Sequence, residues 1–170
     1  CASGQYSSQE STACTNCGVG TYDSDRDAST GCLSCESGKY ASVESLVDDC
    51  FSCVAGKYSD SGASACTDCA SGFYDDDSSA ASACVACASG RFSAAAQTSC
   101  TICAPGQVDS DSNAATECTA CVAGQHSAAG STACTDCAAG EADTDSDAAT
   151  VCVQCAAGTF APAAQTTCTT

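Results

Sequence analysis

The chain has 170 residues, 20 of them cysteine, and a net charge of −17 at pH 7. Leu and Ile are nearly absent and Met and Trp are missing, so the 44% of hydrophobic residues is mainly Ala, Cys and Val. Such a chain cannot offset its conformational entropy by burying one large apolar core. The acidic balance excludes nucleic acid as a partner, and the lack of a long apolar run excludes membrane insertion.

One sequence pattern fills the whole chain. Its plan is Cys-x-x-Gly-x-aromatic, a loop rich in Ser, Ala and Asp, and then Cys-x-x-Cys, whose second cysteine opens the next repeat. The pattern predicts ten repeats, namely residues 1–16, 17–34, 35–52, 53–68, 69–86, 87–102, 103–120, 121–136, 137–154 and 155–170. These are called repeats 1 to 10, and each has an opening and a closing cysteine.

The loops come in two lengths. Short repeats (1, 4, 6, 8 and 10) have twelve residues between the opening and closing cysteines, and long repeats (2, 3, 5, 7 and 9) have fourteen. Repeat 3 is atypical, because Leu46 and Val47 stand where other repeats have Ser or Ala. From Cys53 onward, short and long repeats alternate with a period of 34 residues. No apolar period of 3.6 residues accompanies this spacing, so the repeats are not helical.

Within each repeat the local signals favour turns and short strands. Glycine lies three residues after every opening cysteine, which predicts a tight turn that requires a positive φ. The Gly-x-aromatic segment and the two residues between paired cysteines are extended in character, so we expect short two-stranded ladders and no helix beyond a turn. We expect the aromatic to cover a disulfide; the alternative is a ligand-facing stripe. His126 occupies this aromatic position and reads as a replaced tyrosine.

Cysteine at this density indicates disulfides and an extracellular or secretory environment. The simplest scheme joins the two cysteines of each repeat, and each closed loop then stabilises the fold by about 3 kcal/mol. The alternatives are pairing inside each Cys-x-x-Cys and pairing interleaved between repeats, and sequence alone does not decide among them. The simplest scheme gives Cys1–Cys14, Cys17–Cys32, Cys35–Cys50, Cys53–Cys66, Cys69–Cys84, Cys87–Cys100, Cys103–Cys118, Cys121–Cys134, Cys137–Cys152 and Cys155–Cys168.

Metal chemistry has two candidate signals. The successive Cys-x-x-Cys pairs also match zinc-ribbon spacing, but the acidic surface and the recurring glycine and aromatic argue against zinc. Four long loops begin with alternating acids, which is how several calcium loops begin. Either these are solvated loop tips or they bind calcium weakly through Asp23, Asp25, Asp27, Asp75, Asp77, Asp109, Asp111, Asp143, Asp145 and Asp147.

Catalysis finds no support in the sequence. With His126 as the single histidine, neither a Ser/His/Asp nor a Cys/His set can be assembled. A redox Cys-x-x-Cys would need a βαβ frame, for which there is no signal. We therefore expect a protein that is not an enzyme and needs no cofactor.

The repeat resembles the ephrin-receptor-like cysteine-rich repeats, in units such as Cys1-Ala2-Ser3-Gly4-Gln5-Tyr6 and Cys69-Ala70-Ser71-Gly72-Phe73-Tyr74. It is also similar to the first half-module of tumour-necrosis-factor-receptor cysteine-rich domains, in which the opening and closing cysteines pair. Unlike those receptors, this chain has no second, cross-linked module type. The resemblance extends to long arrays in large surface proteins of algae and protists, including those of flagellar hairs (mastigonemes). It implies an elongated extracellular rod.

These observations predict small disulfide-rich repeats that stack as an elongated, solenoid-like rod of ten short loop/β modules with little helix. The expected function is a structural building block of an extracellular fibre or cell-surface filament. The alternative is a receptor or adhesion ectodomain that binds a protein partner. We expect self-association, head-to-tail or lateral, since Thr169 and Thr170 followed by a second copy's Cys1 would complete a Cys-x-x-Cys. The Ser/Thr-rich loops permit O-glycans.

Overall fold

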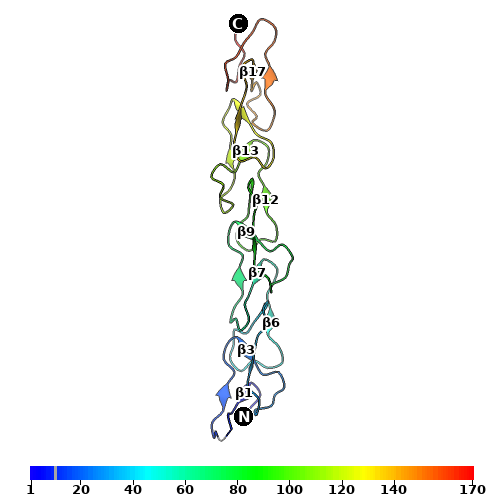
Figure 1. Cartoon of the computed structure of the whole chain (residues 1–170), viewed down its shortest axis with the longest axis vertical. Coiled ribbons are helices and arrows are strands. Elements are labelled where there is room, and N and C mark those ends of the chain that lie inside the picture. Colours follow the sequence, from blue (N-terminus) through cyan, green and yellow to red (C-terminus); the bar gives the residue numbers. More distant parts are fainter. Residues whose placement is uncertain (10) are drawn as a thin grey trace. The chain divides into compact units, whose positions relative to one another are not determined.

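Two-residue strands are the only regular secondary structure in the part of the chain that the structure describes. A computed structural model describes residues 1–9 and 11–170, and within them the chain forms turns, bends and short strands without any helix (Figure 1). None of these residues belongs to a helix of the length and apolarity that a membrane crossing requires. This agrees with the sequence, which has extended signals in each repeat and no helical period.

The strands pair in sequence order, one hairpin to a repeat. In the first, Gln5 lies opposite Asn16 and Tyr6 opposite Thr15 in an antiparallel pair. In the tenth repeat an isolated antiparallel bridge between Phe160 and Thr169 takes the place of the sheet. The paired strands are β1 (Gln5–Tyr6) with β2 (Thr15–Asn16), β3 (Thr21–Tyr22) with β4 (Leu33–Ser34), β5 (Lys39–Tyr40) with β6 (Phe51–Ser52), β7 (Lys57–Tyr58) with β8 (Thr67–Asp68), β9 (Phe73–Tyr74) with β10 (Val85–Ala86), β11 (Arg91–Phe92) with β12 (Thr101–Ile102), β13 (Gln107–Val108) with β14 (Thr119–Ala120), β15 (Gln125–His126) with β16 (Thr135–Asp136), and β17 (Glu141–Ala142) with β18 (Val153–Gln154).

Each hairpin pairs the residues after the turn glycine with the two residues that separate a closing cysteine from the next opening one. The ladder therefore ends at the next repeat, where the N–H of the opening cysteine donates to the carbonyl of the preceding glycine. Cys17 N–H bonds to Gly4 C=O in this way, at 2.9 Å, and Cys155 N–H bonds to Gly140 C=O at 2.8 Å. A hairpin of two-residue strands is too short to be stable alone, so the stability must come from cross-links and from neighbouring repeats.

Ten disulfides supply the cross-links. Each joins the opening and closing cysteine of one repeat, which is the simplest of the three pairing schemes, and no described cysteine is free. Their sequence separation is 13 in the short repeats and 15 in the long ones, as for Cys53–Cys66 and Cys69–Cys84. The chain is thus a series of ten small disulfide-closed β modules.

Sulfur forms the interior of these modules. The largest side chains that are fully buried are the opening cysteines of the five long repeats, with 0–1% of their surface exposed: Cys17, Cys35, Cys69, Cys103 and Cys137. The opening cysteines of repeats 4, 6, 8 and 10 are only partly buried. Because the chain has so few large apolar side chains, disulfide sulfur replaces the aliphatic core of an ordinary domain.

The chain forms two compact units. The first comprises Cys1–Ala70, Tyr74–Val85 and Ala95–Thr98, and the second comprises Ser71–Phe73, Ala86–Ala94 and Ser99–Thr170. In the first unit Cys35, Ala41 and Cys50 form an apolar cluster, against which Tyr22 and Leu46 pack. Tyr22 belongs to repeat 2 and the disulfide to repeat 3, so at this place the aromatic does cover the next disulfide, as expected. Apart from such packing, hydrogen bonds between successive repeats hold each unit together.

Candidate functional site: the junction between successive repeats

A glycine turn begins each junction. Gly4 occupies the third position of a turn closed by the bond from Gln5 N–H to Ala2 C=O at 3.1 Å, the position that needs a positive φ in a type II turn. Its φ is +81°, and the nine glycines at the equivalent position have φ between 76° and 90°. The sequence prediction for these glycines is confirmed. The turn leaves the glycine N–H outside its own hairpin, and this donor bonds to the next repeat.

Where a short repeat precedes a long one, the acceptor is an aspartate side chain. It is the residue six positions after the opening cysteine of the next repeat, which we call the coupling position. In the first unit Gly4 N–H donates to Asp23 Oδ2 at 2.8 Å and Gly56 N–H to Asp75 Oδ2 at 2.9 Å. The second unit repeats the arrangement at 3.0 Å, from Gly90 N–H to Asp109 Oδ2 and from Gly124 N–H to Asp143 Oδ2.

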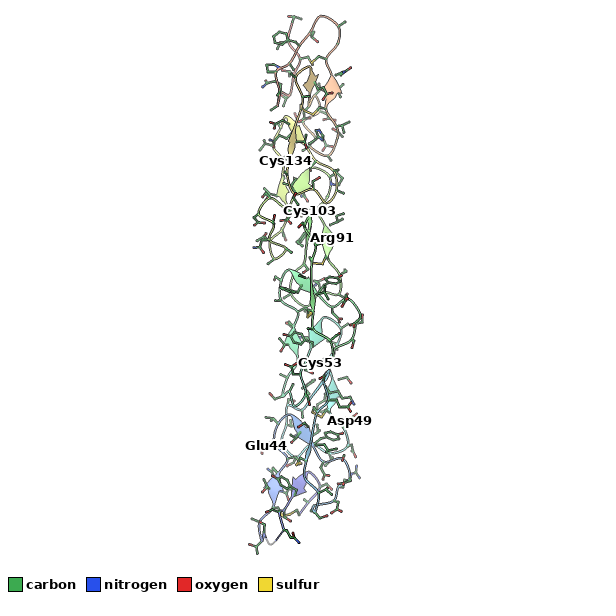
Figure 2. All side chains as sticks on the ribbon, in the orientation of Figure 1. Glu44, Asp49, Cys53, Arg91, Cys103 and Cys134 are labelled. Carbon is green, nitrogen blue, oxygen red and sulfur yellow. A yellow bond between two sulfur atoms is a disulfide. The ribbon has the colours of Figure 1, made fainter. Side chains whose placement is uncertain are left out.

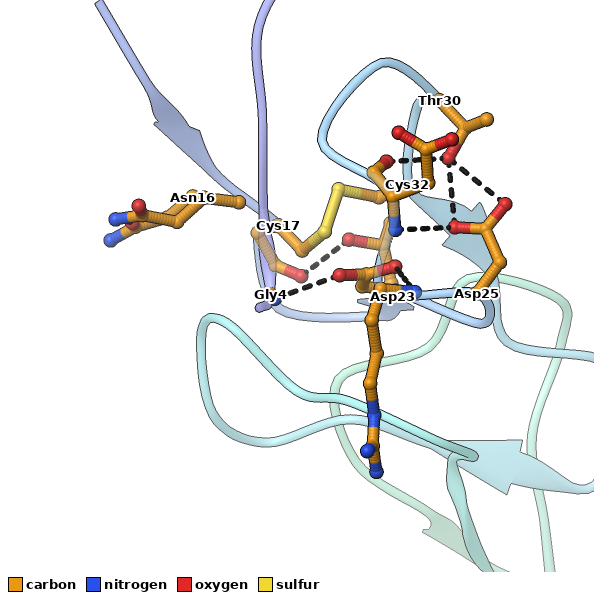
Figure 3. Close-up of a disulfide and its surroundings, with 12 residues drawn as sticks. Gly4, Asn16, Cys17, Asp23, Asp25, Thr30 and Cys32 are labelled. Atoms are coloured by element: carbon orange, nitrogen blue, oxygen red, sulfur yellow. Dashed lines mark hydrogen bonds between the residues drawn. A yellow bond between two sulfur atoms is a disulfide. The ribbon is translucent and has the colours of Figure 1, made fainter. Parts of the chain in front are cut away.

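These four aspartates are buried, although acidic side chains are usually exposed. They are only 5–7% exposed, and in the first of them a second donor, Arg26 N–H, reaches Oδ1 of Asp23 at 2.8 Å. Figure 3 shows Asp23 beside the Cys17–Cys32 disulfide with its bond to Gly4. The bond from the Gly4 N–H is the main cause that holds the pKa of Asp23 below its ordinary value of 3.8. A charged acceptor makes this junction bond stronger than one between neutral groups.

Where a long repeat comes first, the acceptor is a backbone carbonyl at the same coupling position. Gly38 N–H donates to Ser59 C=O at 2.9 Å and Gly72 N–H donates to Ser93 C=O at 2.9 Å. The serine hydroxyl adds a second bond back to the preceding repeat, from Ser59 Oγ to Lys39 C=O at 2.9 Å. The coupling position therefore carries Ser or Ala after a long repeat and Asp after a short one.

The coupling residue also bonds forward, to the repeat that follows its own. Ser59 N–H donates to Ala80 C=O at 3.1 Å, and Asp75 N–H donates to Gln97 C=O at 3.0 Å. The equivalent bond in the second unit runs from Asp109 N–H to Ser131 C=O at 3.0 Å. One buried residue thus links its repeat to both neighbours, and stability in such an array is a sum over repeats and their interfaces.

Contacts also join repeats that are two apart along the chain. A Cβ atom built on Gly56 would lie 2.2 Å from the carbonyl oxygen of Ala96, and one built on Gly124 would lie 2.3 Å from that of Ala164. These pairs join repeat 4 to repeat 6 and repeat 8 to repeat 10. The turn position therefore requires glycine for two reasons: its φ is positive, and the backbone of another repeat passes too close to leave room for a Cβ.

The remaining aspartates of the acidic loops shape the loops themselves. The second of each set accepts a bond from the N–H two residues on and one from a hydroxyl five residues on: Asp25 from Thr30 (Figure 3), Asp77 from Ser82, Asp111 from Thr116 and Asp145 from Thr150. The third, where it is acidic, makes a similar turn, with Asp27 accepting from Ser29 N–H and Asp147 from Ala149 N–H. Backbone N–H groups are the main cause that lowers the pKa of Asp27, Asp77, Asp111 and Asp145.

The structure does not gather the ten candidate calcium ligands into a coordination sphere. Asp23, Asp75, Asp109 and Asp143 are engaged at the junctions, and the others accept bonds within their own loops. In residues 1–9 and 11–170 no three acidic, histidine or cysteine side chains are grouped so that they could hold a metal ion. Calcium prefers six to eight oxygen ligands, so the acidic signature has a structural explanation in the junctions and loop turns.

Repeat 3 departs from the common pattern, as the sequence indicates. Val47 forms a parallel bridge with Asp23, and Asp48 N–H donates to Asp23 C=O at 3.1 Å. Ion pairs join Arg26 to Asp48 at 2.5 Å and Lys39 to Asp49 at 2.7 Å, and Asp49 is the main cause that raises the pKa of Lys39. Glu44 and Asp49, labelled in Figure 2, are exposed.

A shallow pocket lies beside this repeat. Its volume is about 300 Å³, and its lining includes Tyr40, Val54, Lys57 and the Cys53–Cys66 disulfide. The ring of Tyr40 also contacts Phe51, with centroids 5.7 Å apart. His126 lines a separate pocket of about 420 Å³ in the second unit and lies in β15 opposite Thr135.

Part of the chain matches a known protein family. The family described as tyrosine-protein kinase ephrin type A/B receptor-like matches residues 56–94. No curated protein matches the chain at a significant level. The match covers parts of repeats 4 to 6, and together with the regular disulfides it supports a cysteine-rich repeat array of the receptor-ectodomain type. This kind of module is non-catalytic.

The coupling position is the functional feature that sequence reasoning missed. Its signal was present, since the residue six places after the opening cysteine is Asp in four long repeats and Ser or Ala in all others. The sequence alone leaves those aspartates as solvated loop tips or as the first ligands of weak calcium loops. The bonds to glycine could not be foreseen because they join residues 19 positions apart in different repeats.

Proposed function

We propose that the chain is a structural building block of an extracellular fibre or cell-surface filament, stiffened by the disulfide in each repeat. The observation that carries the proposal is the junction. Nearly every buried polar group described above serves to connect one repeat to the next, in the same way throughout each unit. A protein whose recurring residues are used for internal coupling is suited to bear load or to act as a spacer.

The environment of the protein follows from its covalent structure. Ten disulfides without a free cysteine among the described residues require an oxidising compartment. The ephrin-receptor-like match over residues 56–94 points in the same direction, to an extracellular or secreted protein. Both the fibre proposal and the receptor alternative are consistent with an extracellular or secreted location.

Fibre formation requires that copies associate, laterally or end to end. The small side chains of the loops permit close approach, and O-glycans on Ser and Thr are part of the same proposal. The net charge of −17 opposes lateral association, because like charges repel until ions screen them. We therefore expect association to strengthen with ionic strength and with divalent cations, which act by screening.

A receptor or adhesion ectodomain is the second candidate, and repeat 3 is the observation that favours it. There the pattern breaks, three ion pairs lie within or next to the repeat, and the pocket near Tyr40 offers aromatic and aliphatic surface beside Lys57. Tyrosine is typical of protein-binding hot spots. This reading predicts one binding region in the first unit and no self-association.

Electron microscopy of the purified chain, combined with sedimentation, distinguishes the two. The fibre proposal predicts assemblies with a regular axial spacing that become more abundant with added salt or calcium. A chain that stays monomeric at high concentration in both conditions contradicts the fibre proposal and favours the ectodomain. Tyr40→Ala together with Lys57→Ala is the matched variant: it removes partner binding in the ectodomain reading and leaves assembly unchanged in the fibre reading.

A further inference from the structure

The junctions follow a rule that depends on the preceding repeat. After a short repeat the coupling position is Asp23, Asp75, Asp109 or Asp143, and its carboxylate accepts the glycine N–H. After a long repeat the coupling position is a small residue whose backbone carbonyl accepts instead, as Ser59 does for Gly38. The nine junctions of the chain obey this rule.

Repeat 3 shows which of the two neighbours sets the rule. It is long, like the four repeats that carry Asp, but it follows another long repeat and has Ala41 at the coupling position. Gly20 N–H donates to the carbonyl of Ala41 at 2.8 Å. The loop of the preceding repeat, and not that of the repeat itself, therefore decides whether a side-chain acceptor is needed.

The surface of repeat 10 that a following repeat would contact belongs to a short repeat. In the described part of the chain the N–H of Gly158 has no hydrogen-bond partner, and neither has the N–H of Ala161, which is the coupling position of this repeat. An ideal Cβ on Gly158 meets no atom within 4 Å, and this glycine is exposed, whereas Gly4, Gly56, Gly90 and Gly124 in the other short repeats are buried.

We propose that this surface of repeat 10 selectively binds a long cysteine-rich repeat that carries aspartate at its coupling position, of the kind formed by residues 69–86. The aspartate carboxylate accepts the N–H of Gly158, and the backbone of the bound repeat accepts the N–H of Ala161, as in the interior junctions. A short repeat with serine at the coupling position, such as residues 53–68, lacks the reach of the carboxylate. Repeat 1, with Ser7 there, is of that second kind.

The inference concerns how repeats recognise one another and holds whether or not the chain forms fibres. The junction discriminates against a short repeat that lacks the aspartate, because binding such a repeat would leave a buried N–H without a partner. That loss costs more free energy than an ordinary hydrogen bond contributes.

The test extends the full chain beyond Thr170 in three ways. The first extension is a second copy of residues 69–86, the second is the same copy with its Asp75→Ala, and the third is a second copy of residues 53–68. Amide hydrogen exchange of Gly158, resolved by NMR, is the readout. We expect exchange to be slower on the order of tenfold in the first extension than in the other two, as the loss of one junction bond implies.

Equal protection of Gly158 in all three extensions would overturn the proposal, and so would its absence in the first. If an appended repeat does not form its disulfide, a substitution at a junction inside the chain tests the same rule. Asp109 is the coupling residue at a junction where a long repeat follows a short one. Asp109→Ser gives this junction the serine that is found after long repeats, and the rule predicts on the order of tenfold faster amide exchange of Gly90. Unchanged exchange of Gly90 would show that loop length and coupling residue are unrelated.

Discussion

The N–H of Gly56 donates a hydrogen bond to the buried carboxylate of Asp75, 19 residues further along the chain and 2.9 Å away. The two residues belong to successive repeats, each closed by its own disulfide. Disulfides hold each loop but cannot hold one loop to the next, since all ten lie within a repeat. The link between Gly56 and Asp75, with its equivalents, is what makes a string of small rings into a continuous structure.

Removing the acceptor at this junction should destabilise the protein. Asp75→Ala leaves the buried N–H of Gly56 without a partner, which is expected to cost about 1–3 kcal/mol. Asp76→Ala, the control, changes an exposed neighbour for which no hydrogen bond is seen in the described structure, and should be within about 0.5 kcal/mol of the parent. Denaturant unfolding with the disulfides intact measures both. Equal stability of the two variants would mean that the junction bond contributes nothing.

The backbone contact over the turn glycine gives a second prediction. Gly124→Ala must place a Cβ 2.3 Å from Ala164 C=O at a φ of +84°, whereas Gly158→Ala meets open space at a φ of +90°. Both substitutions carry a left-handed backbone cost of roughly 1–2 kcal/mol. The clash adds roughly 1–3 kcal/mol to Gly124→Ala alone. Thermal unfolding of the two variants should therefore separate them clearly; similar melting temperatures would argue that repeats two apart do not touch.

Deleting disulfides should distinguish the two loop classes. Replacing Cys103 and Cys118 by alanine removes a fully buried opening cysteine, whereas replacing Cys121 and Cys134 removes two partly buried ones. The loop-closure contribution is about 3 kcal/mol in both, since loop length enters only logarithmically. The first pair should cost more because its sulfur also fills the interior. The opposite ranking in denaturant unfolding would contradict the sulfur core.

Acid should weaken the fold in a defined pH range. The pKa values of Asp23, Asp77, Asp111 and Asp145 are lowered below 3.8 by the N–H groups that donate to them. Their contribution to stability is therefore fully present above about pH 4 and is lost as the pH falls through the lowered folded-state values, because the unfolded chain then binds more protons.

Melting temperatures measured from pH 7 to pH 2 test this expectation. The parent should be nearly constant down to about pH 4 and then fall. Asp111→Asn removes one titrating group, so this variant should lose less stability than the parent over the acid range. A parent whose stability rises on acidification would instead show that repulsion among the acidic side chains outweighs their hydrogen bonds.

The repeat itself could be read from the sequence because its residues have strong individual requirements. Gly4 and its equivalents need a positive φ, and the residues around Tyr6 and Thr15 favour extended backbone, so turn and hairpin follow from local rules. The pairing of Cys17 with Cys32 is the simplest of three schemes that sequence left open, and it is the one the structure contains. These features depend on residues within one repeat and its immediate neighbour.

The junctions could not be predicted from the sequence, because they depend on how successive repeats pack against one another. Asp23 and Asp25 look alike in sequence, yet Asp23 is buried against Gly4 and Asp25 is exposed and bonded to Thr30. Small residues such as Ser59 and Ala41 give no hydropathy signal that separates them from the surrounding Ser/Ala-rich loop. The sequence places each coupling residue six positions after an opening cysteine, but only the three-dimensional position of the next repeat shows that this residue links two repeats.

Amide hydrogen exchange of the ten turn glycines tests the central claim most directly. In the ¹⁵N-labelled chain at neutral pH, the N–H groups of the nine glycines from Gly4 to Gly140 should exchange slowly, because each bonds to the following repeat. Gly158 should exchange fast and serves as the internal reference. Fast exchange at all ten glycines, with the disulfides intact, would show that the repeats are tethered rings without coupling and would contradict the account.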